Sequence, residues 1–399
     1  MTAPTTPLEI QPKIPAAVRV GMAGLVLFSL GHFFIDLYSA AIGVYQPVLV
    51  DKLRLSLTQA GIIGGVLSLF SSVMQPLYGF LSDRFHSRMF SALAPAVAGI
   101  FISAFGLAPS FGWVLFVAAV GGAGIASFHP QASARATLGI ERNRGRWMAV
   151  FISAGTLGLA AGPIYFSTLL TRFGPEKSAW AAAPGVLMTV LLLARLPETK
   201  APVGPRAKFD WRPLQAVWRP LTILYFLVFI RSVVQISFSQ FLPLYLHRER
   251  GFTLVAAGLA VAMYQGSGAI GGFTGGHLAD RFGGRKVILI SMAGSVPFLI
   301  LFYATTGPIS IVALALGGLI LLFTVPINVV MAQELAPKQS GTVSALMMGF
   351  AWGMAGVIFI PLTGWMAQMY SLHHALAALT VFPVIGFFLA LKLPKTART

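Results

Sequence analysis

Long apolar stretches, separated by short polar turns, dominate the pattern along this chain. Runs of about 20 mostly apolar residues are long enough to cross the hydrocarbon core of a bilayer as α-helices. The fold class predicted is therefore all-α integral membrane, with twelve transmembrane helices. We expect these helices at 20–48, 57–81, 89–108, 112–134, 147–171, 178–196, 220–246, 253–279, 287–306, 308–333, 341–369 and 372–392.

One long polar interruption divides the twelve runs into two sets of six, which predicts two six-helix bundles. The first 19 residues lack the separate apolar core and small-residue cleavage site of a secretory signal, so we read them as a flexible tail. The predicted organisation is a tail at 1–19, a bundle at 20–196, a linker at 197–219, a second bundle at 220–393 and a tail at 394–399.

Composition narrows the class of protein further. The 399 residues are 56% hydrophobic and only 10% charged, whereas an ordinary soluble domain carries about 25% charged residues. This excludes a soluble enzyme. The absence of cysteine excludes disulfides, thiolate metal sites and a cysteine nucleophile.

The excess of basic residues reads as a topology signal. The chain has 28 Lys and Arg against 11 Asp and Glu, a net charge of +17, which on a soluble protein would point to nucleic acid. Twenty-one of the basic residues fall on the side of the two termini and the central linker, and six on the other side. Because cytoplasmic loops are enriched in Lys and Arg, we place both termini on the cytoplasmic side of the membrane and expect no nucleic-acid partner.

The two halves repeat one another. Gly79–Arg84, which reads GFLSDR, recurs 197 residues later as Gly276–Arg281, which reads GHLADR, and Leu57–Gly61 recurs at the same offset as Leu254–Gly258. Parallel halves related by an axis along the membrane normal place a binding site near the midplane between them. The repeat therefore favours a transporter over a receptor or a membrane enzyme.

At these residues the sequence resembles the major facilitator superfamily over nearly its whole length. The superfamily pattern G-x-x-x-D-R/K-x-G-x-R/K-R/K fits Gly276–Lys286 fully, whereas the first copy departs at His86 and Met89. The resemblance implies a monomer with a cytoplasmic gate latch, in which Arg135 is a partner for Asp83; the alternative is that the bases only fix topology. The implied gating residues are Gly79, Asp83, Arg84, Arg88, Arg135, Gly276, Asp280, Arg281, Arg285 and Lys286.

The fifth predicted helix carries Gly158 and Gly162 followed by Pro163, which resembles the G-x-x-x-G-P pattern of proton-coupled drug exporters. Glycines four apart allow a neighbouring helix to approach closely, and proline removes one backbone donor. The further glycines sometimes found after the proline are replaced by Phe166 and Ser167. The pattern favours export, although small-residue packing alone is common in membranes.

A narrower resemblance is to the fosmidomycin-resistance family. It rests on His32–Asp36 (HFFID), Gln75–Arg84 (QPLYGFLSDR) and Ser127–Arg135 (SFHPQASAR). The resemblance implies proton-driven export of fosmidomycin or other small toxic compounds, with the proton gradient as energy source and no cofactor.

Ionisable residues inside apolar segments mark functional sites by default. His32 and Asp36 are four residues apart and share one helix face. Asp36 is the first candidate for a proton carrier; the alternative is a structural carboxylate held by His32. His129, before Pro130, is either a proton relay or substrate ligand, or a cap of the proline kink.

Arg231 aligns within one residue of Asp36 under the repeat, and Gln235 extends its face by one turn. Because arginine keeps its charge, Arg231 either recognises an anionic substrate or pairs with Asp36. Glu334 is a weaker candidate near a helix end. The other residues expected to line the cavity are Tyr38, Gln46, Gln75, Tyr264, Gln265, Asn328 and Trp352.

Two motifs carry no chemistry in this context. Gly266–Gly271 spells the nucleotide-binding G-x-G-x-x-G, but no strand precedes it and it lies in an apolar helix. His373 and His374 lack a third ligand nearby in sequence, so no metal site is predicted. The leading hypothesis is a proton-antiport exporter of a small toxic or drug-like compound, for which an anionic, fosmidomycin-like molecule is a candidate. The alternatives are a proton-coupled importer of a nutrient or organic acid and, less favoured, a non-transporting sensor.

Overall fold

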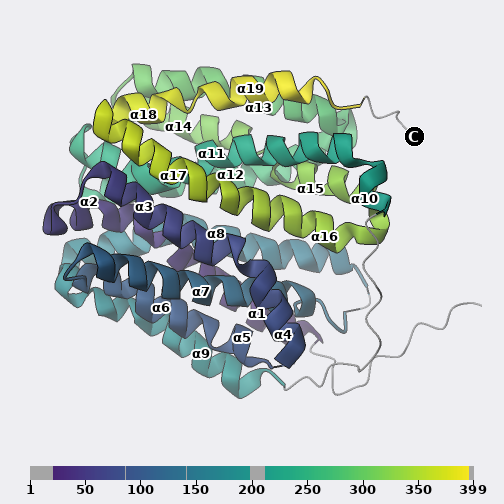
Figure 1. The fold of residues 1–399 in the computed structure, drawn as a ribbon, viewed down its shortest axis with the longest axis horizontal. Coiled ribbons are helices and arrows are strands. Elements are labelled where there is room, and N and C mark those ends of the chain that lie inside the picture. The colour runs from purple at the N-terminus through teal and green to yellow at the C-terminus, as the bar shows by residue number, and fades with distance from the viewer. Residues whose placement is uncertain (1–20, 86, 141, 198–211, 395–399) are drawn as a thin grey trace, which may run out of the picture.

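The computed structural model describes residues 21–85, 87–140, 142–197 and 212–394. These residues form helices and no strand (Figure 1). Twelve helical segments are long and apolar enough to cross a membrane, which confirms the predicted all-α membrane fold. Because the number of spans is even, the two ends of the described chain lie on the same side. We call that side the terminal face and the other side the opposite face.

Six spans form the N-terminal half, and several of them are made of two or three helical pieces. In chain order they are α1 (Gly21–Ser39) with α2 (Ala41–Leu53), α3 (Leu57–Ser68) with η2 (Leu69–Val73) and α4 (Gln75–Phe85), α5 (Met89–Ala92) with α6 (Ala94–Ser103) and η3 (Ala104–Leu107), α7 (Phe111–Arg135), α8 (Arg144–Phe173), and η4 (Pro175–Ala182) with α9 (Ala183–Arg195).

The C-terminal half repeats this plan after the short helix α10 (Arg212–Ala216). Its spans are α11 (Trp218–Arg248), α12 (Leu254–Phe282), α13 (Gly284–Ala304), α14 (Gly307–Leu321) with α15 (Thr324–Leu335), then, after the short turn η5 (Pro337–Gln339), α16 (Ser340–Ser344) with η6 (Ala345–Ala351) and α17 (Trp352–Met369), and α18 (Leu372–Ala378) with α19 (Val381–Ala390).

The helix ends follow the apolar pattern closely, with differences that have local causes. The first span continues to Leu53, beyond the apolar run, because Asp51 and Lys52 lie at the end of the helix, where charge is tolerated. Arg54 then ends the helix in the left-handed conformation, with φ of 51°. The π-helical segments η2 and η6 interrupt two spans, one in each half, and leave no trace in the apolar pattern.

The two halves pack tightly near the opposite face. There α3 packs against α17, α2 against α11, and α8 against α12. At Gly61 the backbones approach so closely that a β-carbon would lie 2.7 Å from the carbonyl oxygen of Ile360. Asp51 and Arg248 form an ion pair between the halves, and the backbone N–H of Leu57 donates to Gln368 Oε1 over 2.8 Å.

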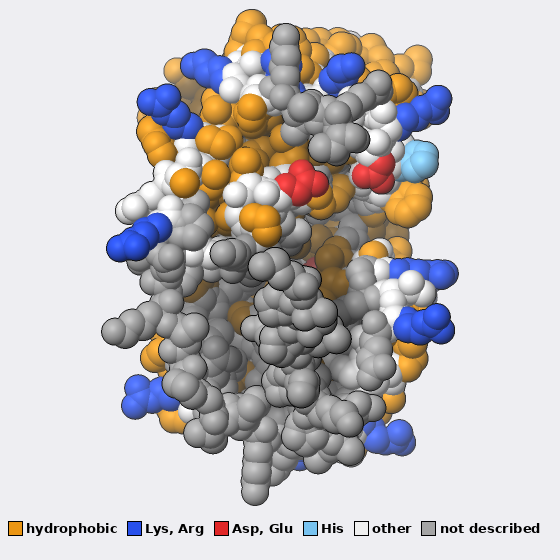
Figure 2. Space-filling model, turned by 90° about the vertical axis from the view of Figure 1, so that its right-hand side faces the viewer, with side chains coloured by type: hydrophobic (Ala, Val, Ile, Leu, Met, Phe, Trp, Pro, Cys, Tyr) orange, Lys and Arg blue, Asp and Glu red, His pale blue; other side chains and the backbone are white. Residues whose placement is uncertain are grey.

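The terminal face has a different arrangement. Beyond the π-helical segments, α4 packs against α7 in its own half, and α16 packs against α15 in the other. Figure 2 looks at this face and shows a hollow between the halves, with Lys and Arg side chains spread around the rim. The described structure is therefore closed at the opposite face and open toward the terminal face.

Candidate functional site

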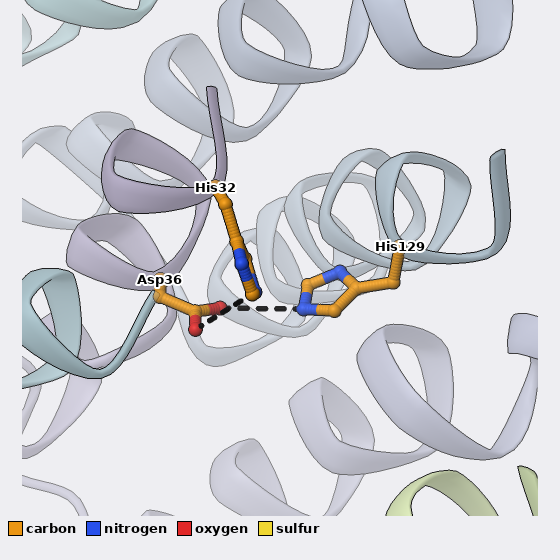
Figure 3. A group of neighbouring side chains, drawn as sticks. All are labelled: His32, Asp36 and His129. Carbon is orange, nitrogen blue, oxygen red and sulfur yellow. Dashed lines mark ion pairs between the residues drawn. The ribbon is translucent and has the colours of Figure 1, made fainter. Parts of the chain in front are cut away.

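Three ionisable side chains meet inside the N-terminal half. His32 and Asp36 lie one turn apart on α1, and His129 reaches them from α7 (Figure 3). Asp36 Oδ2 lies 3.4 Å from His32 Nε2, and Asp36 Oδ1 lies 3.3 Å from His129 Nε2. We call these three residues the His–Asp cluster. The spacing on α1 predicted the first contact, whereas the second joins residues 93 positions apart.

Backbone carbonyl groups fix the other side of each imidazole ring. His32 Nδ1 lies 2.9 Å from the carbonyl oxygen of Phe151 on α8, and His129 Nδ1 lies 3.0 Å from that of Ile125. Proline removes the helical bond to the residue four positions earlier, which for Pro130 is Ala126. His129 therefore does not cap the carbonyl freed by the kink. It bridges its own helix and Asp36.

Gly155 on α8 makes room for the cluster. A β-carbon at this position would lie 2.5 Å from both Asp36 Oδ2 and His32 Nε2. Sequence reasoning missed Gly155, although it stands three residues before Gly158 on the same helix. Gly158 and Gly162 lie against the backbone of α1 at Phe33 and Leu37. The helix-5 glycines thus hold α8 against the helix that carries Asp36, while the carbonyl of Pro163 lies against Gly258 in the other half.

The C-terminal half carries a buried, permanently charged group. Arg231 on α11 is 4% exposed, donates to Gln235, and stacks over the Trp352 ring at 5.3 Å from its centre. Gln235 Nε2 donates to Gln265 Oε1 over 3.4 Å, and Gln265 Nε2 donates to Ser239 Oγ over 2.9 Å. These five residues form what we call the arginine chain.

No carboxylate of the described residues pairs with Arg231, and its buried Nε has no hydrogen-bond partner there. Asp36 contacts the two histidines instead, so the predicted pairing of Asp36 with Arg231 is not present in this state. Burying an unpaired charge is costly. The arrangement therefore offers a desolvated binding partner to an anion.

A pocket of about 80 Å³ lies between the halves, next to the arginine chain. Gln265 and Trp352 line it, as expected from the sequence. The other polar groups that line it are five hydroxyls and one amide: Ser39, Ser68, Ser71, Ser72, Ser239 and Gln240. Except for Ser39, sequence reasoning did not single them out, because serine is common in apolar helices.

Other residues expected at the cavity serve packing instead. Tyr38 donates its hydroxyl to the carbonyl of Ala181 over 2.8 Å and accepts from the N–H of Gly185 over 2.9 Å, within the N-terminal half. Gln46 donates to the carbonyl of Ala60 over 3.2 Å, which joins α2 to α3.

Three further candidates are also placed by the structure. Tyr264 is fully buried, with its ring 5.6 Å from that of Phe238. Asn328 is fully buried on α15. Gln75 donates to the carbonyl of Ser71 over 2.9 Å, within the helix that contains the π-segment. None of the three lines the pocket beside the arginine chain.

The predicted gating residues lie at the terminal face, where the halves are apart. Arg88 donates to the carbonyl of Leu196. Arg135 is 7% exposed, donates to the carbonyl of Pro197 over 3.4 Å and lies over the Phe28 ring. The side chain of Asp83 falls outside the described part of the structure, so its pairing with Arg135 stays a prediction.

The other predicted gating residues divide between packing and exposed positions. Gly79 faces Pro130, and Gly276 faces Pro326. Arg285 donates to the carbonyl of Leu391 over 2.8 Å. The remaining three, Asp280, Arg281 and Lys286, lie near the end of α12 or the start of α13, and all three are exposed. On α4, Arg84 is exposed, and Glu334 on α15 is exposed near a helix end.

Comparison with known proteins identifies the family. The Major Facilitator Superfamily model matches residues 28–350 and 255–399. The chain belongs to the major facilitator superfamily. Proteins of this superfamily are transporters, so this member is a multi-pass membrane transporter and not an enzyme, as the repeat predicted.

Two curated relatives of this superfamily member match over almost their full length. It is 31% identical over 386 residues to the uncharacterized MFS-type transporter YfnC of Bacillus subtilis, covering 94% of this chain and 93% of the relative. It is 29% identical over 383 residues to the fosmidomycin resistance protein of Escherichia coli, covering 93% of this chain and 92% of the relative. The narrower resemblance in the first half of the sequence thus extends over 93% of this chain.

Among solved structures, the superfamily member resembles a bacterial homologue of the human lysosomal transporter Spinster in an inward-facing and occupied conformation. The TM-score is 0.78 at 16% identity, with 92% of this chain and 95% of that chain covered. This likeness shows the fold. It accords with a structure in which the halves are closed on one face and apart on the other.

Proposed function

We propose that this transporter exports small anionic, drug-like compounds in exchange for protons. The observation that carries the proposal is the division of charge between the halves. The N-terminal half holds the His–Asp cluster, whose groups gain and lose protons, and the C-terminal half holds Arg231, which keeps its charge, beside a pocket lined by hydroxyl and amide groups.

A binding site of this kind suits a small molecule with a phosphonate or carboxylate group. The unpaired guanidinium supplies a charge-assisted hydrogen bond, and the serine hydroxyls and Gln240 supply further donors around it. The relative that is named a fosmidomycin resistance protein supports a toxic compound as cargo and outward transport. Alternating access moves the pocket from one face to the other as the halves rock.

We further propose the bacterial inner membrane as the location, with both termini in the cytoplasm. The concentration of Lys and Arg at the terminal face supports this orientation (Figure 2). The open terminal face would then load cargo from the cytoplasm. The transporter would act as a monomer in contact with lipid, with the proton gradient in place of a cofactor.

Proteoliposomes that contain a luminal pH dye test the proposal. Phosphonates, sugar acids and neutral drugs are added outside vesicles with an acidic lumen. Exchange makes the lumen more alkaline on addition of a transported anion, and Asp36→Asn removes this response while Asp51→Asn, an acid at the opposite face, keeps it. If addition of the cargo instead makes the lumen more acidic, cargo and protons move in the same direction, and the protein is a proton-coupled importer.

A further inference from the structure

The hydrogen-bond pattern of the His–Asp cluster sets the position of its protons. A carbonyl oxygen only accepts hydrogen bonds. His32 Nδ1 and His129 Nδ1 each lie within 3.0 Å of a backbone carbonyl oxygen, so each Nδ1 carries a hydrogen. In a neutral ring protonated at Nδ1, Nε2 has a lone pair and no hydrogen.

Both Nε2 atoms face Asp36, and each faces a different carboxyl oxygen, at 3.4 Å for His32 and 3.3 Å for His129. A lone pair that faces a carboxylate oxygen without a hydrogen between them is repelled. We propose that the cluster binds two protons as one unit, with one proton in each contact between an Nε2 and a carboxyl oxygen. This inference rests on the proposed proton coupling and adds its stoichiometry.

The charge of the cluster follows from this count. With both protons bound, Asp36, His32 and His129 together carry +1, and with neither bound they carry −1. With one proton bound the cluster is neutral, but one Nε2 lone pair then faces a carboxyl oxygen with no hydrogen between them, and with no proton bound both contacts are in that arrangement. Ordinary single-carboxyl coupling would move one proton.

The surroundings leave few other groups that titrate. The α8 segment against the cluster runs from Phe151 to Gly158 and contains no ionisable residue, and neither does α6. On α7 the neighbouring charge is Arg135, whose guanidinium lies 6.0 Å from the centre of the Phe28 ring. On α9 it is Arg195, in the last turn, and across the cavity it is Arg231. These arginines hold fixed charges and do not exchange protons at neutral pH.

Loss of the two protons also has a mechanical consequence. His129 and Asp36 lie on different helices, α7 and α1, and their contact is one of the links between those helices. The His129 side chain is 26% exposed, more than twice the 10% of His32, so it has room to move away. Deprotonation would thus release α7 from α1 in addition to changing the charge.

Nitrogen-15 NMR of histidine-labelled full-length protein in lipid nanodiscs tests the inference without any cargo. His32→Gln and His129→Gln identify the two signals. We expect both Nδ1 atoms to keep their hydrogen between about pH 5 and about pH 9, and both Nε2 atoms to gain hydrogen together within one transition. Asp36→Asn should separate the two transitions. An Nδ1 without hydrogen in either ring, or two rings that titrate independently in the unchanged protein, would overturn the two-proton unit.

A second measurement gives the number of protons exchanged for each cargo molecule that is transported. With the membrane potential clamped at zero, two protons per cargo molecule sustain about a 100-fold cargo gradient for each unit of pH difference, whereas one proton sustains about tenfold. A tenfold gradient contradicts the inference while leaving proton exchange intact, and no pH-driven gradient contradicts the proposed function itself. Size-exclusion profiles check that each variant is folded. A stoichiometric divalent ion that copurifies with the protein and is lost in His129→Gln would overturn the proton assignment, because the three ligand atoms lie within 4.8 Å of one another.

Discussion

The first helices of the two halves occupy equivalent places in the repeat and carry opposite chemistry. On α1, Asp36 contacts two histidines, and all three groups are titratable. On α11, Arg231 contacts the Gln235 amide and a tryptophan ring, and its charge is permanent. Under the proposed function, one duplicated scaffold supports two tasks: the N-terminal half responds to pH and the C-terminal half to the charge of the cargo.

The packing around each group fits its task. The His–Asp cluster lies against Gly155, where no side chain intervenes, so its contacts depend on close approach of α8. Arg231 is held by a series of hydrogen bonds that runs to the pocket through Gln265. A change in the first region should therefore alter proton coupling, and a change in the second should alter affinity for the cargo.

The largest expected effect comes from Asp36→Asn, which keeps the shape but removes the exchangeable carboxyl group. Proton-driven transport should fall by at least about 100-fold, the scale of contribution of a positioned acid–base group. Cargo-for-cargo exchange without a pH gradient should persist, because Arg231 is unchanged. Flux in proteoliposomes with and without a pH gradient measures both. Equal loss of both activities would contradict the division between the halves.

Arg231→Gln should weaken the binding of an anionic cargo by about 10- to 100-fold, the effect of losing a hydrogen bond to a charged group. Arg231→Lys should recover part of the affinity, because the charge returns without the planar group that stacks on Trp352. Tryptophan fluorescence titration measures the affinity. Arg219→Gln, at the terminal end of α11, serves as the control. Unchanged affinity in Arg231→Gln would remove this residue from the binding site.

Gly155→Ala should push Asp36 and His32 out of their present contact, because the added methyl group would lie 2.5 Å from Asp36 Oδ2. Overpacking of this kind costs about 1–3 kcal/mol of stability, and proton-driven flux should fall more than cargo binding does. The matched control is Gly266→Ala on α12, where a β-carbon would lie 3.9 Å from its nearest neighbour. Thermal unfolding and flux measurements compare the two variants. Equal behaviour of the two would show that the close contact at Gly155 is not required.

The smallest effect should come from the ion pair between Asp51 and Arg248. Exposed ion pairs contribute about 0–1 kcal/mol, so Asp51→Asn should shift the balance toward opening of the opposite face by a few-fold at most. The protein has no cysteine of its own, so spin labels at Arg54→Cys and Met369→Cys report the distance between the halves directly. A change in the open-to-closed ratio much larger than a few-fold would contradict a minor role for this ion pair.

The fold was largely predictable because bilayer spans are long apolar runs and the repeat fixes how they are grouped. The contact between His32 and Asp36 was predictable from helical spacing, and the place of Arg231 from the repeat. The approach of His129 to Asp36 depends on how α7 packs on α1, which spacing along the chain does not encode. Gly155 was missed for the same reason.

The π-helical segments and the packing role of Tyr38 were not predictable from the sequence pattern. A π-segment changes the hydrogen-bond register without changing the composition, so Leu69–Val73 reads like any other apolar helix. A tyrosine suits a polar cavity and a buried contact equally well. Only the position of the Ala181 carbonyl decides between them for Tyr38.

Close backbone contact at the opposite face has a practical consequence. At Gly61 the two halves meet without an intervening side chain, and a β-carbon there would lie 2.7 Å from the Ile360 carbonyl oxygen and 2.9 Å from the Pro361 α-carbon. One added methyl group, as in Gly61→Ala, would act as a wedge between α3 and α17. Such a variant would favour the conformer that is open on this side, and so provide a sample of the second half of the transport cycle for structure determination.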